Sequence, residues 1–99
     1  MNQTAEEPDL IVIKLSGDIY TEEAVCFREK IMGDIEQGKK RFHIDLAAVR
    51  YIDSSGLGVL IAVQKKLAAS GGQLILSGLT GGIREIFELT QLDKVFTIK

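Results

Sequence analysis

Residues 41–60, RFHIDLAAVRYIDSSGLGVL, join the pattern of a β-strand to the pattern of an α-helix, and this junction decides the fold. From Arg41 to Leu46 apolar and polar side chains alternate, the period of two expected of a strand whose faces differ. We expect a loop over Ala47–Asp53 and then a helix over Ser55–Ala69, which Ser70-Gly71-Gly72 end. The expected apolar stripe of this helix consists of Leu57, Leu60, Ile61, Gln64, Leu67 and Ala68.

The residues before this junction predict another strand and another helix. Asp9–Leu15 is rich in β-branched apolar residues, and Ser16-Gly17 after it suits a turn. Thr21–Glu36 carries apolar residues at helical spacing, with Thr21 as the N-cap candidate and Gly38 just past the end.

The residues after the junction continue the alternation. Residues 73–78 (QLILSG) predict a strand, Gly81–Thr90 predicts a short helix, and residues 94–98 (KVFTI) predict a last strand. Strands joined through helices pair mainly in parallel, because the crossover connections are right-handed. We therefore predict an α/β fold, a four- or five-stranded, mainly parallel or mixed sheet packed with three or more helices.

The chain of 99 residues predicts one domain, because two pieces of half this length would each bury too little apolar surface. We place the domain at residues 9–99, and residues 1–8 form an N-terminal segment that is either loose or an additional edge strand. The Asp53–Leu57 segment is expected to be exposed at the edge of the sheet. The predicted core is Ile11, Ile13, Leu15, Phe27, Ile31, Ile44, Leu46, Leu57, Leu60, Ile61, Leu74, Leu76, Ile86, Phe87 and Phe96.

Composition excludes several classes of function. The 14 acidic and 12 basic side chains are interspersed, so no basic face is expected for nucleic acid. No apolar run approaches the roughly 18 residues of a membrane span, and the polar start lacks the regions of a secretory signal, so we expect a cytoplasmic protein without membrane insertion. The one cysteine, Cys26, permits neither an internal disulfide nor a structural zinc site.

Asp53, Ser54 and Ser55 bring a carboxylate and two hydroxyls to the start of a helix. Such side chains cap the free N–H groups of the first turn, and the helix dipole there favours a negative charge such as a phosphate. Gly56 and Gly58 remove side chains beside the hydroxyls, which would let another protein approach closely. The alternative is that these residues form only a cap and a turn.

The sequence does not match the patterns of a serine hydrolase or of a nucleotide-binding loop. A serine hydrolase needs a base beside its nucleophile, and the one imidazole, His43, is expected to be structural. Neither Ser54 nor Ser55 has a glycine two residues before it, as a nucleophile elbow requires, and SGLGVL lacks the lysine of a phosphate-binding loop. We expect no catalytic residue, cofactor or metal ion.

Three ordered segments resemble the STAS domains of bacterial anti-sigma factor antagonists. LIVIKLSGDI, residues 10–19, looks like a strand of that family and the turn after it. FHIDLAAVRYIDSSGLGVLI, residues 42–61, is similar to the central strand, switch loop and helix. Residues 71–98, GGQLILSGLTGGIREIFELTQLDKVFTI, resemble the terminal strand, helix and strand.

The resemblance implies a switch between partners. In such antagonists the serine after the motif aspartate, here Ser54, is phosphorylated by a serine kinase that is itself the anti-sigma factor, and Ser55 is the fallback acceptor. The unphosphorylated form binds this kinase, phosphorylation releases it, and a serine phosphatase restores the binding form. ATP and magnesium belong to the kinase. We expect the partner surface to include the Gly17–Thr21 turn and the Asp53–Leu57 loop and helix start, because both follow strands and can lie at the same end of a parallel sheet. The expected partner-binding residues are Asp18, Tyr20, Thr21, Asp53, Ser54, Ser55, Gly56 and Leu57.

One departure from the family concerns Tyr20, which stands where the family often has an aspartate. A tyrosine offers a bulky, largely apolar contact in place of a carboxylate, so the partner or the rate of phosphorylation would differ. STAS domains also occur as scaffolds of stress-signalling complexes and as regulatory parts of membrane transport assemblies. A scaffold or regulatory subunit without a switch is therefore the alternative function.

Overall fold

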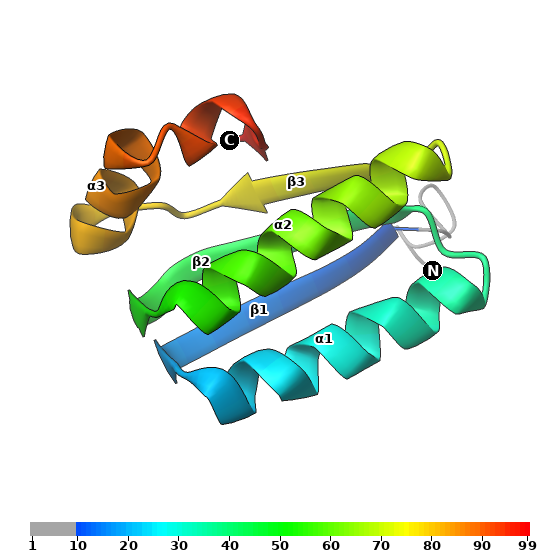
Figure 1. Cartoon of the computed structure of the whole chain (residues 1–99), viewed down its shortest axis with the longest axis horizontal. Helices are drawn as coiled ribbons and strands as arrows, with labels where there is room; N and C mark the ends of the chain where they lie inside the picture. The colour runs from blue at the N-terminus through cyan, green and yellow to red at the C-terminus, as the bar shows by residue number, and fades with distance from the viewer. Residues whose placement is uncertain (1–9) are drawn as a thin grey trace, which may run out of the picture.

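The computed structural model describes residues 10–99 as one sheet with helices packed on it (Figure 1). The predicted N-terminal segment, residues 1–8, lies outside the described residues. The elements in chain order are β1 (Leu10–Ile19), α1 (Thr21–Glu36), β2 (Arg41–Ile52), α2 (Ser54–Ala69), β3 (Gln73–Ser77), α3 (Gly81–Leu89), the 3₁₀ helix η2 (Leu92–Lys94) and β4 (Thr97–Ile98).

All neighbouring strands pair in parallel, in the order β1-β2-β3-β4. Helices α1 and α2 run side by side over one face of the sheet, α1 beside β1 and α2 beside β2 and β3 (Figure 1). The predicted α/β class, with a four- or five-stranded, mainly parallel or mixed sheet, is thus confirmed, and the sheet has four strands, all parallel. Because strands and helices alternate, the ends of β1 and β2 and the starts of α1 and α2 meet at one end of the molecule (Figure 1).

The main correction concerns the length of β1 and β2. The predicted turn at Ser16-Gly17 and the predicted loop over Ala47–Asp53 are both largely strand, because β1 and β2 stay paired up to Ile19↔Ile52. The register shifts between Lys14 and Ser16 and again between Gly17 and Asp18. These bulges interrupt the regular alternation of side chains, so the sequence there no longer has a period of two.

Smaller corrections concern the element ends. The N-cap of α1 is Tyr20 and not Thr21, and α2 begins at Ser54, one residue before the predicted start. The predicted last strand over residues 94–98 is reduced to Thr97–Ile98. Before it the chain forms η2 and carries the buried ring of Phe96 against that of Phe87, with a centroid distance of 5.8 Å. Residues 94–96 therefore pack the Phe96 ring into the core and do not pair as a strand.

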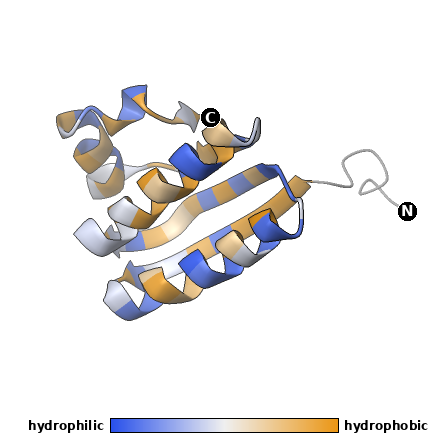
Figure 2. Ribbon diagram, turned by 45° about the vertical axis from the view of Figure 1, so that its right-hand side comes forward, coloured by the Kyte–Doolittle hydropathy of each residue, from blue (hydrophilic) through white to orange (hydrophobic). Residues whose placement is uncertain are grey.

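The core is a single apolar cluster, and the alternation of hydrophobic and hydrophilic residues along β2 is visible in Figure 2, whereas β1 begins with a continuous hydrophobic run. The predicted stripe of α2 is displaced, because the buried residues of this helix include Val59, Leu60, Val63 and Leu67, whereas Gln64 is half-buried and Ala68 exposed. Six predicted core residues, Ile11, Ile13, Leu15, Leu57, Ile61 and Ile86, are only half-buried. The buried apolar residues absent from the predicted core are Ile19, Ala24, Phe42, Val49, Ile52, Val59, Val63, Leu67, Leu79 and Ile83. Of these, Leu67 belongs to the predicted stripe of α2.

Because the buried stripe of α2 is displaced, a leucine-to-alanine substitution should destabilise the protein more at Leu60 than at Leu57. Leu60 is 0% exposed, whereas Leu57 is half-buried against the edge of the cluster. We expect Leu60→Ala to lower the free energy of unfolding by about 2–5 kcal/mol and Leu57→Ala by about half as much or less. Urea unfolding followed by circular dichroism measures both, and equal losses would contradict the observed orientation of α2.

Candidate functional site

Asp53 fixes the junction between β2 and α2. Its Oδ1 accepts hydrogen bonds from the backbone N–H groups of Ser55, at 2.9 Å, and of Gly56, at 3.2 Å. Its own N–H donates to the carbonyl oxygen of Ile19 at 3.1 Å. Asp53 is therefore the N-cap of α2 and at the same time ties the start of this helix to the end of β1.

Ser54 is the first residue of α2 and is exposed. Within residues 10–99 its hydroxyl has no hydrogen-bond partner. It follows β2, which pairs with both β1 and β3, so the predicted switch lies at the carboxyl end of a central strand and not on an edge strand. The position leaves the hydroxyl accessible to another protein.

Ser55 differs from Ser54 because its hydroxyl is engaged. Its Oγ lies 3.0 Å from Oγ1 of Thr21, the first residue of α1, and Ser55 is half-buried. The contact joins the first turns of the two helices. The structure thus brings Thr21 and Ser55 together, and it leaves Ser54 as the more available of the two serines.

Gly56 serves packing, which corrects the prediction that both glycines provide access. Gly56 is buried, and a Cβ atom placed on it would lie 2.6 Å from Cγ1 of Ile52 and 3.0 Å from Cγ2 of Ile19. Only a glycine lets α2 approach the ends of both strands so closely. Gly58 is exposed, and a Cβ there would have nothing within 4 Å, so the space beside it is open.

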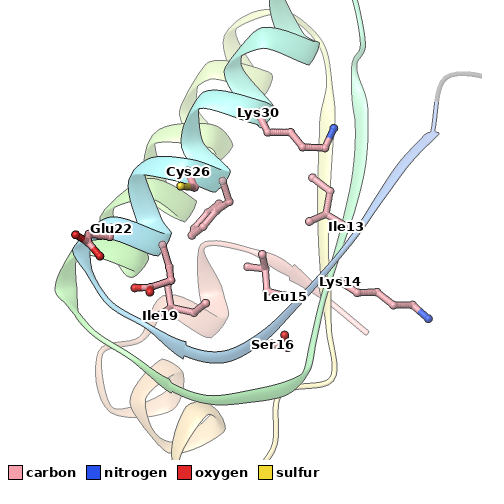
Figure 3. A pocket seen from close by; sticks show the side chains of 10 residues that line it. Ile13, Lys14, Leu15, Ser16, Ile19, Glu22, Cys26 and Lys30 are labelled. Carbon is pink, nitrogen blue, oxygen red and sulfur yellow. The ribbon is translucent and has the colours of Figure 1, made fainter.

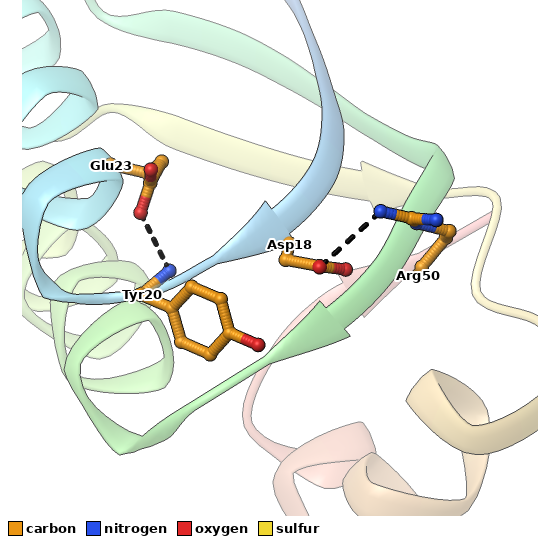
Figure 4. A network of polar contacts seen from close by, with 4 residues as sticks. All are labelled: Asp18, Tyr20, Glu23 and Arg50. Carbon is orange, nitrogen blue, oxygen red and sulfur yellow. Dashed lines mark hydrogen bonds and ion pairs between the residues drawn. The ribbon is translucent and has the colours of Figure 1, made fainter.

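A second group of side chains lies on the same end of the molecule (Figure 4). Asp18 Oδ2 and Arg50 form an ion pair at 3.3 Å, and Glu23 Oε1 accepts a hydrogen bond from the backbone N–H of Tyr20 at 3.0 Å. The rings of Tyr20 and Tyr51 are in contact, with centroids 5.4 Å apart and planes at 42°. The structure therefore collects all the predicted partner-binding residues at one end, where the paired ends of β1 and β2 position them.

Sequence reasoning missed Glu23, Arg50 and Tyr51, which belong to this group. The predicted loop over residues 47–53 hid the last two, because side chains of a loop cannot be assigned to neighbours. Only the parallel register of the structure reveals them, since Asp18 pairs with Tyr51 and Ile19 with Ile52.

Of the remaining polar and hollow features, the hollow adjoins this end of the molecule through Glu23, which lines it, and the other lies apart. His43 Nε2 is 2.7 Å from Ser77 Oγ on neighbouring strands, part-buried and away from the serines of α2. A hollow of about 570 Å³ lies between β1 and α1, where it is lined by residues that include Ile13, Cys26 and Lys30 (Figure 3). No predicted partner-binding residue lines it.

Residues 10–99 contain neither a membrane-spanning helix nor a cluster of metal ligands. No helix in this part of the chain has both the length and the apolar character needed to cross a membrane. In the same range no three side chains of His, Cys, Asp or Glu are grouped so that they could hold a metal ion.

Known proteins resemble this chain in sequence and in fold. The family model of the STAS domain matches residues 2–99. The anti-sigma-B factor antagonist of Bacillus subtilis is 34% identical over 88 residues, which cover 89% of this chain and 80% of the relative. The structure of the anti-sigma factor antagonist SpoIIAA in its unphosphorylated form matches with a TM-score of 0.72 and 26% identity, over 88% of this chain and 89% of that chain. The structure of the Bacillus cell fate determinant SpoIIAA in the phosphorylated form matches with a TM-score of 0.76 and 25% identity, over 92% and 83%.

The close approach at Gly56 predicts opposite effects for two glycine substitutions in α2. We expect Gly56→Ala to lower the free energy of unfolding by about 1–3 kcal/mol, because the new methyl group overlaps Ile52 and Ile19. We expect Gly58→Ala to raise it by about 0.5–1 kcal/mol, because alanine favours the helix and meets open space. Urea midpoints measure both changes, and a neutral Gly56→Ala would contradict the packing described.

Proposed function

The chain belongs to the STAS domain family, and we propose that it works as an anti-sigma factor antagonist whose switch is the hydroxyl of Ser54. The unphosphorylated protein binds an anti-sigma factor and so frees the sigma factor that this partner would otherwise hold. The partner is a serine kinase that phosphorylates Ser54, and a serine phosphatase restores the binding form. The chain is a substrate of these enzymes rather than a catalyst, and it acts in the cytoplasm, where bacterial sigma factors act.

One observation carries the choice of Ser54. Its hydroxyl is exposed at the first position of α2 and free of partners within residues 10–99, whereas the Ser55 hydroxyl contacts Thr21. A kinase can therefore take up the Ser54 side chain without breaking a hydrogen bond of the fold. Phosphorylation of Ser55 would separate the first turns of α1 and α2.

The cap made by Asp53 determines what a phosphate on Ser54 would do. The Asp53 carboxylate already accepts hydrogen bonds from the backbone N–H groups of Ser55 and Gly56, so these two donors are not free to bind phosphate oxygens. A phosphate would add about −1.5 to −2 charges beside an existing carboxylate and would stand in solvent. Burying such a group under a partner costs a large desolvation energy unless the partner supplies matching donors. The modification thus alters the contact surface while the fold keeps its cap.

The proposal predicts a phosphate on Ser54 in the native cell. The protein is isolated with phosphatases blocked from exponentially growing and from stressed cells, and intact mass with fragmentation maps any phosphate. We expect one added phosphate in the wild-type chain, none in Ser54→Ala, and the same phosphate on Ser54 in the matched control Ser55→Ala.

Two outcomes would overturn this assignment. A phosphate that persists in Ser54→Ala and disappears in Ser55→Ala would move the switch to Ser55. A wild-type chain without phosphate under every condition would favour a constitutive scaffold or a transporter-associated STAS domain. The serines would then serve only to begin the helix.

A further inference from the structure

Two tyrosine rings form an exposed aromatic pair next to the switch. Tyr20 is 50% exposed and Tyr51 is 45% exposed, although their rings already cover part of each other. In Figure 4 the Tyr20 ring projects from the start of α1 toward the end of β2, which carries Tyr51 three residues before Ser54. The other exposed large apolar residues within 10–99 are the aliphatic Val12, Val25, Leu89 and Val95.

The backbone of each tyrosine is held by hydrogen bonds or strand pairing, and the two rings contact each other. The backbone of Tyr20 is fixed on both sides, because its N–H donates to Glu23 and its carbonyl oxygen accepts from the N–H of Ala24 at 2.8 Å. Tyr51 lies within β2 beside Ile52, whose side chain is 2% exposed. Rings that are ordered before binding lose little conformational freedom in a complex, which favours their use as contact anchors.

Charges around the pair are mainly negative. Residues 18–23, DIYTEE, carry three carboxylates and no cation, and residues 50–53, RYID, carry one of each. Arg50 is paired with Asp18, which leaves the exposed carboxylates of Glu22 and Glu23 on the side of α1. A complementary partner surface is therefore apolar at its centre and basic around it.

We propose that the Tyr20–Tyr51 pair is the anchor by which the serine kinase of this chain recognises it. The inference rests on the proposed function and adds the residues that select the kinase. The kinase places an apolar side chain against the two rings, and this contact holds Ser54 at its active site. Tyrosine is among the residues that most often dominate the energy of a protein interface, and an existing aromatic pair offers a larger apolar contact than a single ring.

The test measures how fast the native kinase modifies each variant in the cell. Each variant is expressed from an inducible gene copy in the native organism, so that it is unphosphorylated when first made. The phosphatase is blocked, and intact mass measures how the phosphorylated fraction increases with time. We expect Tyr20→Ala and Tyr51→Ala to slow phosphorylation of Ser54 at least about tenfold. Tyr20→Phe and Tyr51→Phe retain the rings and should stay within about twofold of the wild type. Leu89→Ala is the matched control, because Leu89 is 84% exposed on α3 and should leave the rate unchanged.

The outcomes separate this inference from the proposed function. Wild-type rates in both alanine variants, or losses in the phenylalanine variants as large as those in the alanine variants, would overturn the anchor while leaving the switch at Ser54 intact. A wild-type chain that never acquires phosphate would overturn the switch and the anchor together. Urea midpoints measured on every variant show whether a slower rate reflects the lost ring or a lost fold, and an alanine variant that is slow only because it unfolds counts against the anchor.

Discussion

The parallel pairing of β1 and β2 up to their last residues is the constraint on which the rest of the structure depends. It places Ile19 opposite Ile52, buries both, and so gives α2 a surface against which Gly56 packs without a side chain. The hydrogen bond from Asp53 to the carbonyl oxygen of Ile19 closes the same junction. Because the two strands end together, the two helices that follow them start together, and every candidate functional side chain lies at those strand ends or helix starts.

Regular periodicity made most of the fold predictable from the sequence. The alternation of Arg41–Leu46 and the helical spacing of Thr21–Glu36 correctly predicted their elements, because side-chain direction there follows a fixed period. The extension of β2 to Ile52 was not predictable in this way, since the bulges opposite Ser16 and Asp18 break the period of two while the backbone pairing continues. The length of the last strand was overestimated because the ring of Phe96 packs against that of Phe87, and this packing outweighs strand pairing over residues 94–96.

The site was predictable as a set of positions but not as a set of contacts. A polar cluster after a strand indicated the Asp53 cap, and the rule that parallel strands end at one edge placed Tyr20 and Thr21 beside it. The pairing of Tyr51 with Tyr20 and of Arg50 with Asp18 needed the register of the two strands. The packing role of Gly56 likewise required the distance to Ile52, which no local pattern contains.

The cap made by Asp53 has a consequence for how such a domain can evolve. Asp53 holds the helix, while its neighbour Ser54 presents an exposed hydroxyl, so with Ser54 as the proposed switch the structural and signalling roles would fall on separate residues. Repeated addition and removal of a phosphate then does not act on the hydrogen bonds that keep the chain folded. Duplicated copies of such a domain could then acquire new partners through substitutions at exposed neighbours such as Tyr20, while the strands, the helices and the Asp53 cap stay the same. Signalling pathways that use different copies in one cell could thereby keep separate partners.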